Sequence, residues 1–90
     1  MADALTPMMQ QYQRLRGSVP EDTLLLFRLG DFYELFFEDA KEASVLLRVL
    51  RATRNAVTLC GVPSLAVLVC TAQLSRAGRR VAVGDLTNGP

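Results

Sequence analysis

Residues 23–37 read TLLLFRLGDFYELFF, two short apolar runs separated by Gly30-Asp31. The first run, residues 23–29, is bounded by acids on one side and by Gly30 on the other, which is typical of a buried strand. Glycine followed by aspartate is a turn signal, and the aromatic-rich second run, residues 32–37, suits another strand. The stretch therefore predicts two strands joined by a turn.

A short amphipathic helix is predicted ahead of these strands, over residues 7–16. Thr6 can cap its start, and Pro7 suits the first helical position. Gly17 is a good stop signal. The apolar stripe of this helix follows helical spacing and consists of Met8, Met9, Tyr12 and Leu15.

A second helix is predicted to follow the strands. Asp39 stands at its start with Glu42 three residues later, the arrangement of a capping box. The residues expected to face the core are Ala40, Ala43, Leu46, Leu47 and Leu50.

The rest of the chain adds a strand, an ambiguous segment and a last strand. Residues 56–60 suit a short strand that ends at Gly61. Ser64 can cap residues 65–77 and Gly78 can stop them, which favours a helix, although the β-branched start also suits a strand. Residues 80–83 suit a strand. The alternation predicts an α/β fold, a small mixed β-sheet flanked by helices, in one domain over residues 1–90.

Composition excludes several classes of protein. Half of the 90 residues are apolar and the net charge is +1, which excludes intrinsic disorder, and no apolar run is long enough to span a membrane. The chain lacks histidine, which removes His-based catalysis and most zinc sites. Cys60 and Cys70 are interpreted as buried free thiols rather than a disulfide, so a cytoplasmic location is expected.

Charge is distributed unevenly along the chain. Residues 1–42 hold eight acids and four bases, whereas residues 43–90 hold six arginines and one acid. A basic half can indicate a polyanionic partner, and scattered solvent-facing arginines are the alternative interpretation.

Phe32 and Glu34 form the most informative pair for function. On a strand they share a face, about 6.6–6.8 Å apart along the chain. An aromatic ring can stack on a base, and a carboxylate can accept a hydrogen bond from a base edge. The alternative is an ordinary strand with Phe32 in the core. No phosphate-binding loop is present, and Asp31 with Glu34 is the only acid/base pair that an enzyme could use.

Two blocks of sequence resemble the N-terminal domain of the MutS family of DNA mismatch repair proteins. They are Thr6-Pro-Met-Met-Gln-Gln-Tyr12 and Leu25-Leu-Phe-Arg-Leu-Gly-Asp-Phe-Tyr-Glu-Leu-Phe36, followed by Asp39-Ala-Lys41. The resemblance implies that Phe32 enters the minor groove and stacks on a mispaired or unpaired base, while Glu34 hydrogen-bonds to that base. Gly30 and Asp31 would form the turn that presents them.

The resemblance also implies partners. The expected ligand is double-stranded DNA with a mismatch or small loop. The full-length family protein uses ATP and Mg²⁺, forms a homodimer and binds a MutL-type partner, whereas no cofactor, ATPase domain, catalytic or metal site, or membrane contact is expected in these 90 residues. Charge alone makes four arginines candidate phosphate contacts: Arg54, Arg76, Arg79 and Arg80.

The chain also departs from the family pattern. Ser64-Leu65-Ala66 stands where the family usually has Tyr-His-Ala, and residues 65–70 lack a polar outer face. The domain is expected to lack its last strand. A diverged fragment that acts as a protein-interaction module through residues 65–70, without DNA binding of its own, is the alternative function.

Overall fold

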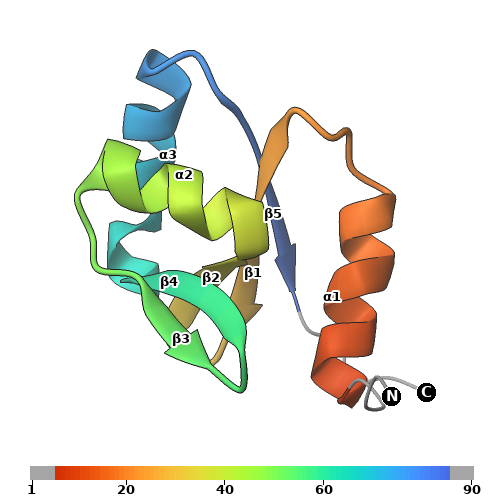
Figure 1. The fold of residues 1–90 in the computed structure, drawn as a ribbon. Helices are drawn as coiled ribbons and strands as arrows, with labels where there is room; N and C mark the ends of the chain where they lie inside the picture. Colours follow the sequence, from red (N-terminus) through yellow and green to blue (C-terminus); the bar gives the residue numbers. More distant parts are fainter. Residues whose placement is uncertain (1–5, 86–90) are drawn as a thin grey trace.

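A five-stranded mixed sheet with helices on both faces makes up the fold (Figure 1). The computed structural model describes residues 6–85. Its elements, in chain order, are α1 (Pro7–Gly17), β1 (Thr23–Leu29), β2 (Phe32–Phe36), α2 (Phe37–Leu47), β3 (Ala52–Arg54), β4 (Val57–Pro63), the 3-10 turn η1 (Ser64–Ala66), α3 (Val67–Arg76) and β5 (Arg80–Asp85). The small mixed α/β architecture expected from the sequence is confirmed.

The strand order is β3-β4-β2-β1-β5. The pairs β3–β4, β4–β2 and β2–β1 are antiparallel, and β5 lies parallel to β1. The crossover from β4 to β5 runs through η1 and α3. Strand β1 therefore lies inside the sheet, which explains why it is apolar along most of its length.

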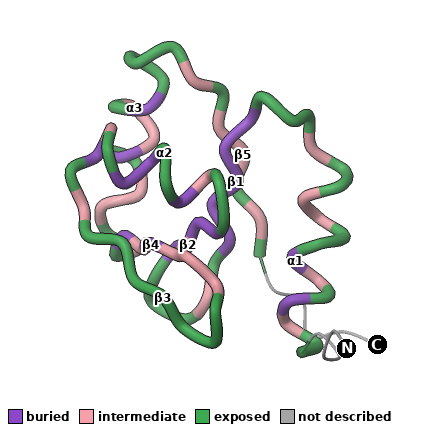
Figure 2. Tube along the Cα trace, viewed as in Figure 1, coloured by how far each residue is buried: buried purple, intermediate pink, exposed green. Residues whose placement is uncertain are grey.

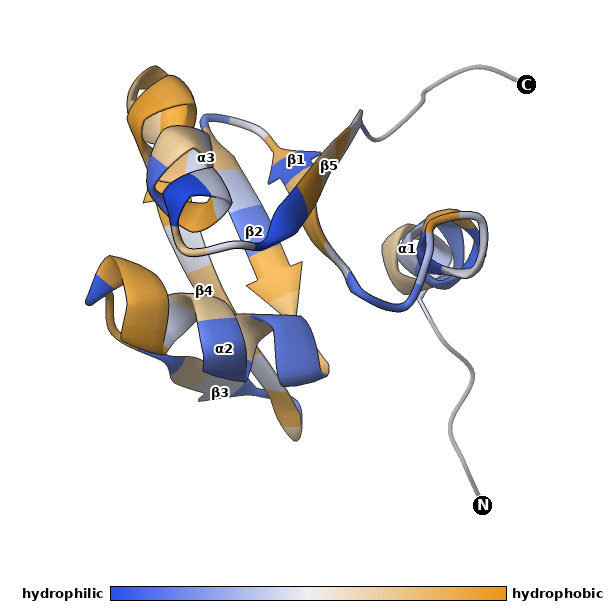
Figure 3. Ribbon diagram, turned by 90° about the horizontal axis from the view of Figure 1, so that it is seen from above, coloured by the Kyte–Doolittle hydropathy of each residue, from blue (hydrophilic) through white to orange (hydrophobic). Residues whose placement is uncertain are grey.

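The two faces of β1 enter separate clusters of buried side chains. Leu24 and Leu26 face α2 and α3, whereas Leu25 and Phe27 face α1. Figure 3 shows α1 on one side of the sheet and both other helices on the opposite side. Strict alternation of the strand thus divides its continuous apolar run between two cores.

Helix α1 begins as its sequence predicts. Pro7 occupies the first turn, and the Thr6 hydroxyl accepts a hydrogen bond from the Met9 amide at 3.1 Å. On the sheet-facing side, Tyr12 makes edge-on contacts with Phe27 and Phe36, at ring-centroid distances of 5.8 and 4.8 Å. The cap and this aromatic cluster together fix α1 over one face of the sheet.

Asp39 does not cap α2, so that prediction is wrong. The helix begins two residues earlier, at Phe37, and Phe36 precedes it without a side-chain cap. The Asp39 carboxylate instead accepts hydrogen bonds from the Leu25 amide at 3.1 Å and from Arg16 at 3.2 Å. Because these partners lie on β1 and α1, the carboxylate joins three elements, which outweighs a local cap.

Several smaller expectations need correction. Leu50 is 92% exposed and lies beyond α2, so it does not belong to the core face. Ser64 makes no capping hydrogen bond; η1 follows Pro63, and α3 begins at Val67. The helical interpretation of residues 65–77 is otherwise confirmed.

A short hairpin was not predicted. Strand β3 pairs with β4, and all three of its residues are exposed, as Figure 2 shows in green. The expected strand 56–60 is in fact β4, which extends to Pro63. The expectation of a missing last strand concerns residues beyond Asp85, outside the described residues. Within residues 6–85, no helix is long and apolar enough to cross a membrane.

Candidate nucleic-acid interface

The β1–β2 turn places Phe32 at the rim of the sheet. Leu29 pairs with Phe32, so Gly30 and Asp31 form a two-residue connection. Gly30 has φ +64°, a conformation that residues with a Cβ rarely adopt, and this explains the glycine. The Asp31 carbonyl accepts a hydrogen bond from the Ser64 amide at 2.8 Å, which fastens the turn to η1. The rim is therefore a braced corner of the fold.

Phe32 differs from the other aromatic residues of its strand. Its side chain is 47% exposed, whereas Tyr33 and Phe36 are buried on opposite faces of β2. The alternative in which Phe32 belongs to the core is therefore excluded. A half-exposed phenyl ring on a braced turn is available to stack on a flat ligand at little cost to the core.

Glu34 lies two residues further on, on the same face as Phe32 and Phe36. Its cross-strand neighbours are Phe27 on β1 and Gly61 on β4. The Glu34 Oε1 atom is buried and has no hydrogen-bond partner among the described residues. Burial raises the pKa of this carboxyl above its ordinary value, and the positive charge of Arg54 opposes the shift. Glu34 therefore carries one hydrogen-bond acceptor that the described residues leave unused, and this atom is shielded from solvent.

A pocket of about 490 Å³ opens beside Glu34. It lies between the start of α1, strand β2 and the β3–β4 hairpin, and its charged residues are Glu34 and Arg54. The remaining lining residues are polar or apolar: Thr6, Met8, Met9, Leu29, Phe36, Asn55, Val57 and Leu59. An apolar pocket with few charged groups is suited to a partly apolar, flat ligand that also offers a hydrogen-bond donor.

Arg54 is the candidate arginine that lines the pocket beside Glu34, although its strand position lies past the Phe36 end of β2 rather than at the Phe32 end. It is exposed at the end of β3 and pairs with Val57 across the hairpin. The connection between them is Asn55-Ala56, and both residues have positive φ, 52° and 65°. This hairpin holds the guanidinium of Arg54 near the carboxylate of Glu34.

The other three candidate arginines lie away from Phe32 and from the pocket beside Glu34. Arg80 pairs with Thr23 at the start of β1, whereas Phe32 pairs with Leu29 at its end, which places the two sites about 20 Å apart along the strand. Arg76 ends α3, two residues before the turn into β5 reaches Gly78. The structure therefore does not bring Arg76, Arg79 and Arg80 together with Phe32 and Glu34.

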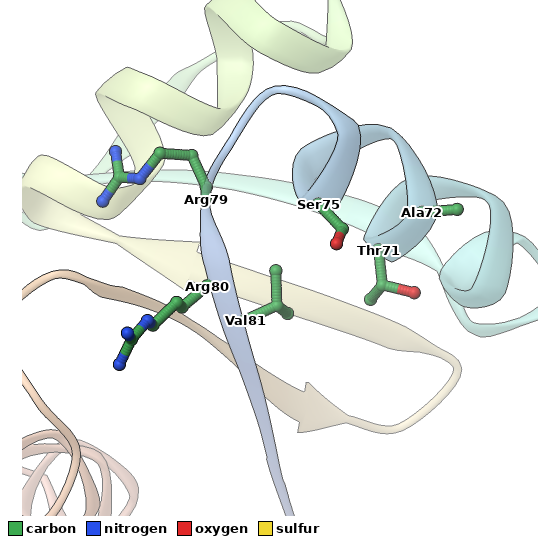
Figure 4. Close-up of a pocket in the computed structure, with 6 residues that line it drawn as sticks. All are labelled: Thr71, Ala72, Ser75, Arg79, Arg80 and Val81. Carbon is green, nitrogen blue, oxygen red and sulfur yellow. The ribbon is translucent and has the colours of Figure 1, made fainter.

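Two of these distant arginines already have acidic or carbonyl partners. Arg79 forms an ion pair with Glu42 and donates to the Asp22 carbonyl at 2.9 Å. The Arg80 Nε atom lies 4.0 Å from the Asp22 carboxylate. In Figure 4, the Arg79 and Arg80 side chains extend to one side of β5, and the hydroxyl groups of Thr71 and Ser75 on α3 lie on the other side. Arg79 in particular holds α2 and the α1–β1 connection together.

Two residues of the candidate interface were missed from the sequence. Gly61 lies under the Glu34 carboxylate: a Cβ built on Gly61 would be 2.8 Å from each of its oxygens. Arg28 lies near the turn, where its guanidinium packs over the Tyr33 ring at 5.8 Å and its Nε donates to the Gly30 carbonyl at 3.2 Å. Arg28 carries the one charge within the apolar run 23–29, and that is the signal that could have identified it.

The two cysteines lie away from solvent. Both are buried and free, as expected. Burial raises the pKa of Cys60 to about 11, with a further contribution from the charge of Glu34, and burial also raises the pKa of Cys70. The thiols are therefore protonated at neutral pH and pack as small apolar groups.

Fold and site together define a class: small mixed α/β domains with a half-exposed phenylalanine and a buried carboxylate side by side at one end of the sheet. A family model described as MutS domain I matches residues 6–90. The chain belongs to this family.

Individual relatives of the chain belong to the same family. The DNA mismatch repair protein MutS of Treponema denticola is 42% identical over 85 residues, covering 94% of this chain and 9% of that relative. The protein of the same name from Solibacter usitatus is 47% identical over 90 residues, covering 94% and 10%. That of Bacillus velezensis is 40% identical over 95 residues, covering 100% and 11%. The chain thus spans about a tenth of the length of these relatives.

Proposed function

We propose that this domain recognises mispaired or unpaired bases in duplex DNA as part of mismatch repair. In this proposal Phe32 stacks on the base at a kink, and Glu34 accepts a hydrogen bond from it. The observation that carries the proposal is the exposed Phe32 ring on a braced turn, on the same face as a carboxylate with an unpartnered oxygen. Membership of the MutS domain I family supports it.

The physical basis is the lower cost of deforming damaged duplex. A mismatch weakens pairing and stacking, so kinking the helix there costs less than in matched DNA. Stacking on an aromatic ring, worth about 1–3 kcal/mol per base, offsets part of the remaining cost. The role is recognition rather than catalysis. ATP, Mg²⁺, a homodimer and a MutL-type partner would involve parts of the family outside this chain.

Fluorescence anisotropy with labelled duplexes tests the proposal. At fixed salt, the chain is expected to bind a G·T or single-base-bulge duplex more tightly than the matched duplex. Phe32→Ala is expected to weaken binding to the mismatch by about 5- to 150-fold and to leave matched binding unchanged. Because Phe32 is half exposed, the variant should keep its fold, which circular dichroism checks.

Phe37→Ala is the matched control. Phe37 is also partly exposed, at 38%, but it lies at the start of α2 and away from the turn. This variant is expected to keep the mismatch preference. Equal affinity of the wild-type chain for both duplexes, or equal losses from the two variants, would refute the assigned role of Phe32.

A second candidate function is a protein-interaction module. Leu65, Leu68 and Val69 are 98%, 80% and 64% exposed at the start of α3, at the spacing of one helix face. Much of α3 is coloured hydrophobic in Figure 3. If this face mediates self-association, sedimentation velocity should show a concentration-dependent shift that Leu68→Glu abolishes without loss of the fold. A monomer at every concentration would exclude self-association through this face.

A further inference from the structure

The Glu34 carboxylate lies in a place that exists only because residue 61 has no side chain. Glu34 and Gly61 are directly paired across β2 and β4, so a side chain on residue 61 would point to the same face. A Cβ there would lie 2.8 Å from both carboxylate oxygens and 2.9 Å from Cδ of Glu34. Carbon atoms do not approach that closely, so any larger residue must displace the carboxylate.

The backbone itself does not require glycine at this position. Positive φ among the described glycines occurs at Gly30 and Gly78, whereas Gly61 lies in regular antiparallel pairing within β4. Glycine inside a strand costs stability and often marks a close approach of another group. Here the approaching group is the Glu34 carboxylate.

The surroundings hold the carboxylate in a dry, weakly charged environment. The charged neighbour that acts on it is Arg54 on β3, whereas the thiol of Cys60 points to the opposite face of the sheet and donates to the Ala40 carbonyl. The start of α1 contributes uncharged residues to the same pocket, Thr6, Met8 and Met9. The carboxylate has therefore lost much of its hydration before any ligand arrives.

We propose that Gly61 is a specificity-determining residue, because it keeps open the place where the Glu34 carboxylate is held ready to accept a hydrogen bond from a base. The inference rests on the proposed function of Glu34. A glutamate free in solvent would have to lose rotamer freedom and hydration on contact with the base, whereas a carboxylate already held in place loses less of both. Gly61 is thus a positioning residue that acts through Glu34.

Gly61→Ala tests the proposal with little effect on the fold. The φ of Gly61 is not positive, so alanine can adopt it, and the atoms that must move are the carboxylate end of the flexible Glu34 side chain. The preference for mismatched over matched duplex is expected to fall about tenfold, with affinity for matched duplex unchanged. Gly17→Ala is the matched control, because a Cβ there meets nothing within 4 Å.

A second readout does not depend on DNA. A carbon-detected NMR titration of the Glu34 carboxyl should give a raised pKa in the wild type and in Gly17→Ala. In Gly61→Ala it should return toward the ordinary value of 4.5, because the displaced carboxylate is hydrated. In a Glu34→Ala background, Gly61→Ala should cause no further loss of mismatch preference.

The outcomes separate the two proposals. A wild-type chain without mismatch preference contradicts the proposed function, whatever the titration gives. A wild-type preference that survives in Gly61→Ala overturns the role of Gly61 while leaving the proposed function intact. If Gly61→Ala does not fold, Glu34→Asp, whose shorter side chain cannot reach over Gly61, must lose the preference for the inference to stand.

Discussion

Ala56→Gly is expected to stabilise the domain, because Ala56 has a left-handed backbone conformation. Its φ is 65°, and it follows Asn55, φ 52°, in the two-residue β3–β4 connection. Such a turn needs positive φ at both positions, and Asn-Gly is the pair that it favours. This conformation is unfavourable for alanine by about 1–2 kcal/mol, whereas glycine adopts it without a steric penalty.

The gain is smaller than the full penalty because glycine also loses more entropy on folding. That loss is about 0.5–1 kcal/mol relative to alanine. Ala56 is exposed, so removing its methyl group sacrifices no core contact. The difference between these two ranges is centred on a gain of about 0.8 kcal/mol, equivalent to a rise of about 3–6 °C in the melting temperature of a domain this size.

Thermal and urea unfolding followed by circular dichroism measure this gain, with Ala77→Gly as the control. Ala77 is also exposed, at the end of α3, but its φ is −81°. The control should therefore be destabilised by about 0.5–1 kcal/mol. If both variants lose stability equally, the assigned turn conformation is wrong, and with it the position of Arg54 beside Glu34.

Three further predictions concern other strained or charged positions. Arg48 ends α2 with φ 58°, so Arg48→Gly should add about 0.5–1 kcal/mol to the unfolding free energy in urea. The folded pKa of Glu34 is raised above its usual 4.5, so the stability of the wild type relative to Glu34→Gln should be highest below that pH. It should fall as pH rises through the folded pKa, in unfolding curves measured from acid to neutral pH. Arg16→Met removes the guanidinium that donates to Asp39 at 3.2 Å and to the Thr23 carbonyl at 2.6 Å, and should cost about 2–3 kcal/mol in the same assay. An Arg16→Met loss no larger than that of an exposed-arginine control such as Arg14→Met would contradict the role of this cluster.

The parts of the fold that local chemistry specifies were predictable from the sequence. The bounds of β1, Thr23–Leu29, coincide with the apolar run, and the turn at Gly30-Asp31 follows from the need for positive φ. The start of α1 follows from Thr6 and Pro7. In each case the neighbours in the sequence are also the neighbours that determine the conformation.

Tertiary partners account for what the sequence did not reveal. Asp39 has the spacing of a helix cap, but hydrogen bonds to Leu25 and Arg16 on other elements take its carboxylate. The β3–β4 hairpin was missed because Asn55-Ala56 lacks the glycine that usually marks such a turn. Neither the partners of a carboxylate nor an unusual alanine conformation can be read from local pattern alone.

The candidate site was predictable only in the part that local sequence determines. Strand alternation alone places Phe32 and Glu34 on one face, and the structure agrees. The role of Gly61 depends on the register between β2 and β4, and that register is set by the whole sheet. A glycine 27 positions away from its glutamate carries no visible signal in a single sequence.

In the folded chain, part of the charge asymmetry of the sequence is taken up by ion pairs between the two halves. Arginines of the basic second half approach acids of the first half: Arg79 pairs with Glu42, and Arg80 approaches Asp22. These ion pairs connect elements away from Phe32, whereas Arg54 lines the pocket beside Glu34. Phosphate contacts carry the salt dependence of DNA binding. On the proposed function, affinity at this site therefore rests on one stacked ring and one accepted hydrogen bond, so its preference for a mismatch should change little with salt even where overall affinity falls.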